Sequence, residues 1–413
     1  MDTRQPDKPA DSGTPGAFIL GGAHGSLAIA RSLGRRGIPV WFMKDDHPLP
    51  GLSRYTQRRF ASDGLSPAAT VDRLLDIARI HGLRGWVLFA GSDAMVRLVA
   101  EHHARLGEVF RLTTPPWSIA QFAYDKRLTY AQADAAGIDY PHTYHPRDRD
   151  DLADLACRFP VVLKPSARER SNPFTMAKGW KASDRQKLTA RYEQAAAMVG
   201  DGGIVLQEYI PGDGSTQFSY GAVWAGGAPV ASLVARRTRQ FPIDFGLTST
   251  FVETIDNPAV EEAAFRFLSR LNYDGIVELE FKFDQRDGRY KLLDFNARSW
   301  TWMGLGTRAG VDFAHILFES ALGRRASVRG RPGAVWMHLT RDLAAGYQHV
   351  AAGTLTPWAY LRSLHWPVEL AAFAWDDPLP GVIELPLTLY RATARRVRFP
   401  TRAPTKPQRD VAA

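Results

Sequence analysis

The chain has 413 residues, of which 45% are apolar and 23% charged, as in an ordinary globular protein with two or three domains. Its formal net charge of +9 favours anionic partners such as nucleotides, acidic substrates, nucleic acids or phospholipid surfaces. The basic residues are scattered apart from the stretch Ala394–Arg402, and no helix-turn-helix or zinc-finger pattern accompanies them, so we predict no nucleic-acid partner.

Three features bear on the compartment. Residues 1–16 are polar and lack the apolar core of a signal peptide, so we expect a disordered leader. The longest uncharged run, 214–235, is interrupted by glycines and Pro229 and predicts two strands rather than a membrane span. Cys157 is the only cysteine, which excludes an internal disulfide and favours a reducing, cytoplasmic location.

The segment 17–46 predicts a strand, a glycine-rich turn, a helix and a second strand. Such a βαβ unit places the turn at a helix N-terminus, where phosphate groups bind readily. Gly21, Gly22 and Gly25 do not form the GxGxxG fingerprint, although Asp45 lies at the end of the second strand. An NAD(P)-dependent oxidoreductase that uses this unit is therefore an alternative function.

The same α/β pattern continues with a helix, a strand and a helix, over 68–81, 86–91 and 94–106. Ser92 and Asp93 follow the strand directly, at the edge where open α/β sheets bind ligands. Asp93 is therefore a candidate substrate-binding residue. The pattern predicts a Rossmann-like α/β domain over 17–117.

Two lysines lie at the ends of the next predicted elements. A helix over 125–137 begins with Asp125 and Lys126, and the strand 159–166, FPVVLKPS, ends with Lys164 and a proline. Each lysine has an ordinary alternative as a surface residue. The position of Lys164 at a strand end favours a contact with phosphate.

The region of about 140–212 is expected to form a lid. Its segment 167–184 is polar and basic, as is typical of a loop over phosphates and also of an ordinary surface loop. A helix over 185–199 and a strand over 203–214 follow it. The polar residues of that last strand are Gln207, Glu208 and Asp213.

An arginine cluster follows, in the sequence ARRTRQFPIDFG, and a helix is expected over 257–271. The cluster consists of Arg236, Arg237 and Arg239, which are either a solvated charge run or a site for an acidic substrate. We select Arg236 and Arg239 as candidate substrate contacts.

The stretch 276–300 predicts a β-hairpin, because apolar and polar residues alternate with period two on both sides of a turn at 284–288. With this five-residue loop, Glu278 lies opposite Asp294. The residues expected to share one face are Glu278, Glu280, Asp294 and Asn296. Carboxylates facing one another repel unless a cation lies between them, and hard oxygen ligands suit Mg²⁺ or Mn²⁺. A solvated sheet face is the alternative.

After a helix over 312–322, the pattern changes. Residues 326–413 are rich in tryptophan, proline and leucine and lack clear βα alternation. We expect a C-terminal extension with a disordered basic end, for which peripheral contact with a membrane surface is an open alternative.

These segments, in this order, resemble the ATP-grasp superfamily of carboxylate–amine ligases, whose members include D-alanine–D-alanine ligase, biotin carboxylase and D-aspartate ligase. The resemblance covers about 18–322 and includes the DK helix, the strand ending in KP, the QEYIPG strand and the acidic hairpin. It implies a Rossmann-like pre-ATP-grasp domain followed by a two-lobed, α+β ATP-grasp domain over 118–325. The family binds ATP and Mg²⁺ and acts on small carboxylates and amines.

The resemblance also implies roles for single residues. It assigns the ATP phosphates to Lys126 and Lys164, the adenine to Gln207, Glu208 and Ile210, the ribose to Asp213, and the metal to Glu280, Asp294 and Asn296. Arg298 would lie near the acyl phosphate and, with Lys164, would be catalytic.

Two positions depart from the family pattern. Asp294 stands where a glutamate is usual, and this shorter side chain favours Mn²⁺ as an alternative to Mg²⁺. The lid lacks the usual glycine pair, which leaves the roles of Lys178 and Lys181 open. We therefore predict an ATP-dependent carboxylate–amine ligase, with the oxidoreductase and a non-catalytic ATP-binding protein as alternatives.

Overall fold

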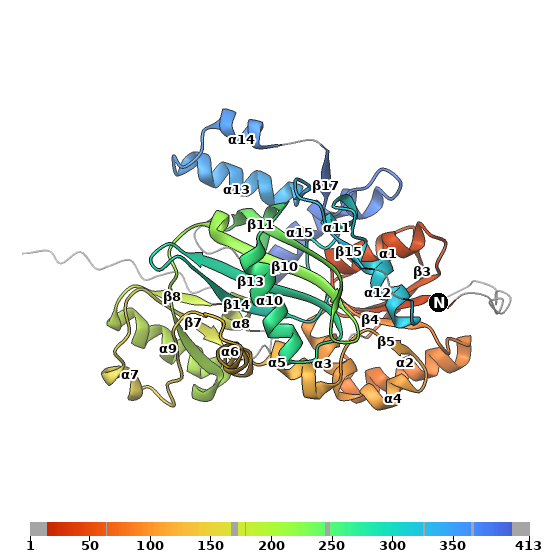
Figure 1. The fold of residues 1–413 in the computed structure, drawn as a ribbon, viewed down its shortest axis with the longest axis horizontal. Helices are drawn as coiled ribbons and strands as arrows, with labels where there is room; N and C mark the ends of the chain where they lie inside the picture. Colours follow the sequence, from red (N-terminus) through yellow and green to blue (C-terminus); the bar gives the residue numbers. More distant parts are fainter. Residues whose placement is uncertain are drawn as a thin grey trace, which may run out of the picture.

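The computed structural model describes residues 15–62, 64–166, 172–177, 179–243, 248–324, 327–364 and 367–398. Most of the predicted leader, the centre of the predicted lid loop with Lys178, and the residues after 398 lie outside these ranges. Within them, the chain forms a parallel sheet, a small antiparallel sheet and a large mixed sheet. Figure 1 shows the large sheet between the other two.

The first sheet contains five parallel strands in the described ranges. Their order is β3 (Thr56–Ala61), β2 (Val40–Lys44), β1 (Ala17–Leu20), β4 (Val87–Ala90) and β5 (Arg111–Leu112). The associated helices are α1 (His24–Gly34), α2 (Pro67–His81), α3 (Asp93–Glu101) and α4 (His103–Gly107), with the 3₁₀ helix η1 (Leu49–Leu52). The central strands β1 and β4 are apolar and buried, as expected of parallel strands covered on both faces.

Local signals explain where the helices of this sheet begin and end. The Ser66 side chain accepts a hydrogen bond from the N–H of Ala69, and Pro67 occupies the first turn of α2. Gly82 ends the helix in the left-handed conformation, with φ of 67°. The bounds of this helix agree with the predicted range of 68–81 to within one residue.

The small sheet is antiparallel and has four strands among the residues described. Their order is β6 (Thr143–Tyr144), β9 (Ile204–Glu208), β7 (Val161–Pro165) and β8 (Trp180–Ala182). The helices nearby in the chain are α7 (Asp151–Asp154), α8 (Pro173–Met176) and α9 (Arg185–Val199), with η2 (Asp201–Gly203). Apolar residues of β7, β9 and α9 form a separate hydrophobic core, so this sheet packs as a lobe of its own.

The large sheet has eight strands in the part of the chain that is described. Their order is β14 (Arg289–Asn296), β13 (Gly275–Asp284), β10 (Gln217–Trp224), β11 (Pro229–Phe241), β12 (Thr248–Ile255), β16 (Val335–Met337) and β17 (Val368–Leu370), with β15 (Val328–Arg329) beside β11. Its neighbours in the chain are α5 (Trp117–Tyr124), α6 (Lys126–Ala135), α10 (Pro258–Arg270), α11 (Leu305–Arg308), α12 (Phe313–Ala321) and η3 (Gly214–Thr216). Helix α10 lies across β10 and β11 (Figure 1).

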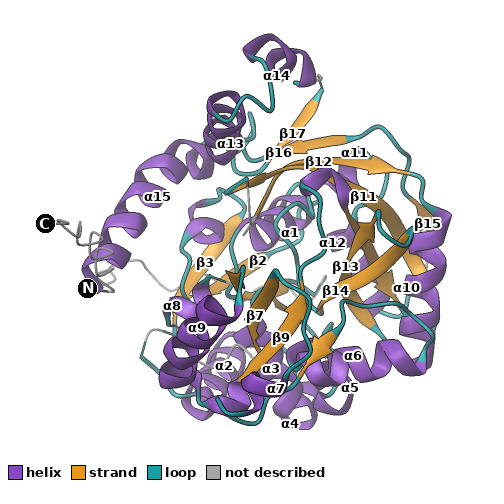
Figure 2. Cartoon of the chain, turned by 90° about the vertical axis from the view of Figure 1, so that its left-hand side faces the viewer, coloured by secondary structure: helices purple, strands orange, loops and turns teal. Residues whose placement is uncertain are grey.

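The residues after 326, expected to form an extension, contribute β15, β16 and β17 to the large sheet. Figure 2 shows β12, β16 and β17 side by side, with two helices beyond them, α13 (Leu339–Ala351) and α14 (Pro357–Ser363). The last helix, α15 (Leu379–Arg398), contains the start of the basic stretch. Within the described ranges, no helix combines the length and the apolar character needed to cross a bilayer.

Candidate active site

The acidic residues of the hairpin lie on one face of β13 and β14. Glu280 is paired with Asp294, and Glu278 with Asn296. The pairing shifts between Glu280 and Phe281, because β14 has a bulge at Leu293. The prediction that these four polar side chains share a face is confirmed.

The predicted register of the hairpin is wrong. The first strand extends one residue farther than expected, so that Asp284 pairs with Arg289 and the loop has four residues rather than five. The Asp284 carboxylate accepts hydrogen bonds from the backbone and guanidinium of Arg286, which holds the tight turn. A shorter loop would by itself place the acidic groups of the two strands on opposite faces. The bulge restores the shared face.

Cationic and amide groups surround these acidic side chains. Nζ of Lys126 donates to Oδ1 of Asp294 at 2.6 Å, and Nη2 of Arg237 donates to Oε2 of Glu280 at 3.1 Å. Nδ2 of Asn296 donates to Oε2 of Glu278 and to Oε1 of Glu280, each at 3.2 Å. The negative charge on this face is therefore partly balanced by groups from α6 and β11.

The surroundings of Glu278 on this face shift its pKa. It is buried, and Nε1 of Trp302 donates to its Oε1 at 2.9 Å. Burial, together with the nearby negative charge of Glu280, raises the pKa of Glu278 to about 7. A bound cation would reverse this effect, because it stabilises the charged carboxylate.

Arg298 connects the acidic face with Asp93, which lies beyond the carboxyl end of the parallel strand β4. Its Nε donates to Oδ1 of Asp93 at 2.7 Å, and its Nη2 donates to Oδ1 of Asn296 at 3.2 Å. Asp93, at the start of α3, therefore lies beside the predicted catalytic arginine. A crevice next to this contact is lined by residues of α3, α5, α6, β7 and β14 and by Ser166.

The glycine turn after β1 is held by Asp45. The Asp45 carboxylate accepts hydrogen bonds from the N–H of Gly22 at 3.2 Å and from the hydroxyl of Ser92 at 2.6 Å. A Cβ atom at Gly21, whose φ is +62°, would lie 2.1 Å from Oδ2 of Asp45. These contacts occupy the carboxylate that the oxidoreductase alternative needs for a ribose.

The predicted adenine residues lie on and after β9. Gln207 is buried, and its Nε2 donates to Oγ1 of Thr143 at 2.8 Å. Its Oε1 is buried without a hydrogen-bond partner among the described residues. Ile210 is also buried. A buried acceptor beside an apolar side chain suits the amino group of a purine ring.

Glu208 and Asp213 make contacts within the protein. Glu208 accepts hydrogen bonds from Nζ of Lys291 and from Nη2 of Arg286, both at 3.0 Å. Asp213 is exposed and caps η3, where it accepts hydrogen bonds from the N–H and the hydroxyl of Ser215. Its position next to the QEYIPG segment is compatible with the ribose role, which remains a prediction.

Lysines from the small and the large sheet lie near this segment. Lys164 on β7 and Lys181 on β8 share a face, because Lys181 pairs with Val162, two residues before Lys164. Nζ of Lys181 lies 3.9 Å from the centroid of the Tyr209 ring. On the other side, Nζ of Lys282 lies 5.8 Å from the same centroid, and burial lowers its pKa to about 8.

The two arginines selected as candidate substrate contacts, Arg236 and Arg239, do not lie on the acidic face. Arg239 is buried on the opposite face of β11 from Arg237, and its guanidinium forms two hydrogen bonds with Asp342 of α13, at 2.8 and 2.9 Å. Arg236 also points away from the acidic face and pairs with Glu253 at 3.3 Å. A register shift between Arg237 and Arg239 separates two side chains that a regular strand would place together.

Three residues of the acidic face were not selected as site residues from the sequence. Glu278 and Lys282 follow the same period-two alternation as Glu280, so their shared face could have been read from the pattern. Arg237 stands in the predicted arginine cluster, but nothing in the sequence distinguishes it from its two neighbours.

The side chains of this face fit a hard divalent cation. Glu280 and Asp294 offer carboxylate oxygens on paired positions, and the perturbed Glu278 indicates negative charge that a cation would stabilise. Asn296 presents its amide nitrogen to the two glutamates, so its amide would have to rotate for Oδ1 to bind the same ion. Its assigned orientation follows from the hydrogen-bond network.

Comparisons with known proteins identify the fold. No protein-family model matches the sequence. The D-aspartate ligase of Enterococcus faecium (strain Aus0004) is 22% identical over 280 residues, which are 63% of this chain and 66%, just under two thirds, of that ligase. The L-amino acid ligase from Bacillus licheniformis superposes with a TM-score of 0.58 at 17% identity, over 76% of this chain and 75% of that chain.

A third similar structure is the biotin carboxylase domain of the Hydrogenobacter thermophilus 2-oxoglutarate carboxylase, solved with MgADP, ADP and bicarbonate. Its TM-score is 0.60 at 15% identity, and the superposition covers 77% of this chain and 73% of that chain. Both superpositions cover about three quarters of this chain, so the common fold includes most of the described elements. The superpositions show that the chain has the ATP-grasp fold, and the sequence match shows a similarity to the D-aspartate ligase.

Proposed function

We propose that the chain is an ATP-dependent ligase that activates a carboxylate as an acyl phosphate and joins it to an amine, releasing ADP and phosphate. The observation that carries this proposal is the acidic face of β13 and β14, with Lys126, Arg237 and Arg298 placed around it. The similarity to the D-aspartate ligase supports an amino-acid or peptide-like amine as the second substrate.

Different residues beside the acidic face would bind the different parts of ATP. Gln207, Glu208 and Ile210 would contact the adenine and Asp213 the ribose. Lys126 and Lys164 would bind the phosphates. Glu280, Asp294 and Asn296 would hold Mg²⁺, or Mn²⁺, which offsets charge on the phosphate oxygens when it is bound. The biotin carboxylase domain solved with MgADP supports both ligands.

The chemistry proceeds in two displacements. A carboxylate oxygen of the first substrate attacks the γ-phosphorus of ATP, and the bond to the β-phosphate oxygen breaks to release ADP. The amine nitrogen then attacks the carbonyl carbon, phosphate leaves, and the amine loses a proton. Lys164 would stabilise the charge that develops in the first displacement, and Arg298 would stabilise the acyl phosphate and the oxygen that becomes anionic during the second.

Arg237 extends this proposal to substrate binding. It is the arginine of the cluster whose guanidinium lies on the acidic face, 3.1 Å from Glu280. It is therefore a better candidate than Arg236 or Arg239 for contact with an acidic substrate or a phosphate group. The single cysteine, Cys157, supports the proposed cytoplasmic location, where ATP is available.

The test is a phosphate-release screen in which carboxylic acids are crossed with amino acids, followed by mass spectrometry of the product. In a productive pair, Lys164→Ala should lower kcat by at least about 100-fold, the scale for losing one charged contact to a transition state. Lys187→Ala is the matched control, because Lys187 is an exposed lysine of α9 that pairs with Asp184. An unchanged kcat for Lys164→Ala would contradict the assignment.

A further inference from the structure

A buried cluster of two histidines and a glutamate lies away from the acidic face. His24 is the first residue of α1, His338 follows β16, and Glu384 lies in α15. All three are buried, with exposed fractions of 7%, 0% and 6%. One ligand atom from each residue, the three lying within 4.8 Å of one another, could reach a common point.

The spacing of these atoms is close to that of a metal site. Ligand atoms about 2.0–2.2 Å from a tetrahedral Zn²⁺ lie roughly 3.3–3.6 Å from one another. Nε2 of His338 lies 3.3 Å from Oε1 of Glu384, and Nε2 of His24 lies 2.5 Å from the same oxygen. Of these two contacts, the second must lengthen by about 1 Å to match a metal site, and the ligand atoms of the two histidines lie within 4.8 Å of each other.

One atom of the cluster has no hydrogen-bond partner. Nε2 of His338 is fully buried and makes no hydrogen bond to any described residue, although Oε1 of Glu384 is near it. Buried polar atoms in native proteins usually have a partner, so an orphaned imidazole nitrogen within 4.8 Å of two other ligand atoms indicates a missing ligand. The opposite nitrogen, Nδ1, lies 3.4 Å from Oγ1 of Thr340, a contact that would help to orient the ring.

The surroundings supply both charge signs. The positive charge of Arg341 acts on His338 and disfavours the binding of a cation there. The Glu384 carboxylate supplies the opposing negative charge directly at the cluster. A nearby arginine, Arg391, is already paired with Asp46 at 2.5 Å.

We propose that His24, His338 and Glu384 bind one transition-metal ion of the Zn²⁺ class. Two imidazoles and a carboxylate are a ligand set that suits Zn²⁺ and not Mg²⁺, which requires oxygen ligands. The site is separate from the proposed ligase chemistry and does not depend on it.

The metal would join three parts of the chain that are far apart in sequence. His24 and Glu384 are separated by 360 positions, so the ion would fasten α15 to the start of α1 and to the end of β16. The neighbouring loop already binds α1, since Nε of Arg31 donates to Asp377 at 2.9 Å and Arg35 pairs with Asp376 at 2.7 Å. The ion would therefore complete an attachment of the C-terminal residues to the front sheet.

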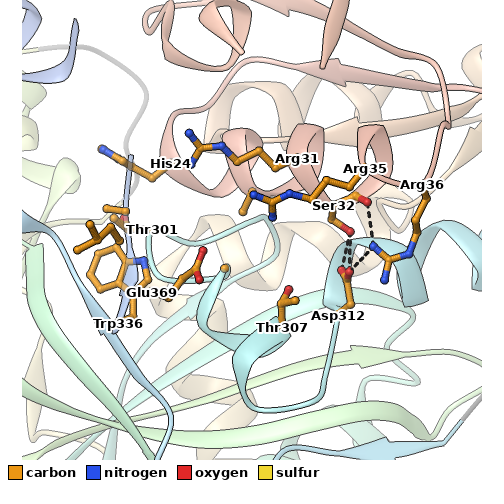
Figure 3. Close-up of a pocket in the computed structure, with 14 residues that line it drawn as sticks. His24, Arg31, Ser32, Arg35, Arg36, Thr301, Thr307, Asp312, Trp336 and Glu369 are labelled. Atoms are coloured by element: carbon orange, nitrogen blue, oxygen red, sulfur yellow. Dashed lines mark hydrogen bonds and ion pairs between the residues drawn. The ribbon is translucent and has the colours of Figure 1, made fainter. Parts of the chain in front are cut away.

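A cavity lies beside the cluster and is lined by one of its ligands, His24. Figure 3 shows His24 and Trp336 on one side of this cavity and the arginines of α1 along another. On the far side, Asp312 accepts hydrogen bonds from Ser32 and pairs with Arg36. Water from this cavity would complete a tetrahedral site with three protein ligands.

The experiment uses the full chain, treated with a chelator and dialysed, then titrated with ZnCl₂ in an excess of Mg²⁺ that saturates oxygen-rich sites. Calorimetry and metal analysis should give one Zn²⁺ per chain, and Zn²⁺ should raise Tm. Glu384→Gln and His338→Gln should each weaken binding by more than the roughly 10–100-fold that losing a hydrogen-bond partner of a metal ligand costs. His349→Gln is the matched control, because His349 in α13 contacts only Thr354 among the described side chains.

Replacement by Co²⁺ adds a readout of geometry, since a four-coordinate site with imidazole ligands gives intense visible absorption that should be absent from Glu384→Gln. Glu384→Gln preserves the size of the side chain, so the variant is expected to fold. No Zn²⁺ uptake by the chelated wild type, or equal uptake by the wild type and both ligand variants, would overturn the proposal. ATP turnover is not a readout, so failure here leaves the ligase proposal untouched.

Discussion

Two arginines two positions apart on β11 belong to different parts of the molecule. Arg237 faces the acidic side of the large sheet and pairs with Glu280. Arg239 faces the other side, stacks over the Phe251 ring at 4.2 Å and pairs with Asp342. The first pair lies in the proposed catalytic cleft, whereas the second joins the sheet to α13.

The difference shows what an ion pair contributes in each setting. The Arg239–Asp342 pair is nearly excluded from water, with side-chain exposures of 6% and 0%, so losing one partner leaves a buried charge. The Arg237–Glu280 pair is less buried, at 11% and 16%, and its members have other polar neighbours. We expect the buried pair to govern stability and the cleft pair to govern activity.

The largest effect should come from Arg239→Met. The change leaves the Asp342 carboxylate buried without its cation and should lower the free energy of unfolding by about 3–5 kcal/mol. Chemical denaturation measures this value. The turnover of the variant, per folded molecule, should change little.

A second substitution sharpens this expectation. In the double variant Arg239→Met/Asp342→Asn, the uncompensated charge is absent, and the asparagine side chain can still contact the hydroxyl of Tyr360. Most of the lost stability should therefore return. Additive losses in the double variant would show that the buried charge is not the cause.

The next effect concerns activity and comes from Glu280→Gln. Loss of this carboxylate should remove a metal ligand and lower ATP turnover by about 100–1000-fold, equivalent to about 2.7–4 kcal/mol. Mg²⁺–ATP should no longer raise Tm by the wild-type amount. The matched control is Glu253→Gln, because Glu253 pairs with Arg236 away from the acidic face.

The ion pairs of the acidic face also affect the stability of the metal-free protein. If the facing carboxylates only repelled each other, removing either Glu280 or Asp294 would make that protein more stable. Glu280 and Asp294 are, however, paired with Arg237 and Lys126. Removing Asp294 leaves the buried Lys126 without a hydrogen bond to that carboxylate and should cost about 1–3 kcal/mol in the metal-free protein.

The smallest effect is a pH dependence of stability from Glu278. Its folded pKa of about 7 lies above the ordinary value of 4.5, so its contribution to stability is fully present below pH 4.5 and is lost as the pH rises to 7. In a chelating buffer, Glu278→Gln should be more stable than the wild type above pH 7, because the glutamine carries no charge that must be buried. The difference should vanish near pH 4.5. A pH-independent difference between the two proteins would contradict this assignment.

Much of the fold was accessible from the sequence, because its signals are local. The helix predicted over 185–199 is observed as α9 with the same bounds, since Asp184 caps its start and Gly200 follows its end. The alternation along β13 indicated its acidic face, and the order of the motifs indicated the superfamily. The lysine and acidic residues chosen from the resemblance lie around the cleft, although their contacts with ATP and metal remain predictions.

What the sequence alone determined is therefore the fold class and the type and order of most elements over about 17–322. Only the tertiary structure decided the bulge at Leu293 and the register shift before Arg239, which set the faces of the side chains beyond them. It also brought His24, His338 and Glu384 together. Period-two alternation holds only within an unbroken ladder, and both the position of a bulge and the meeting of distant segments depend on partner strands and packing, which no local pattern encodes.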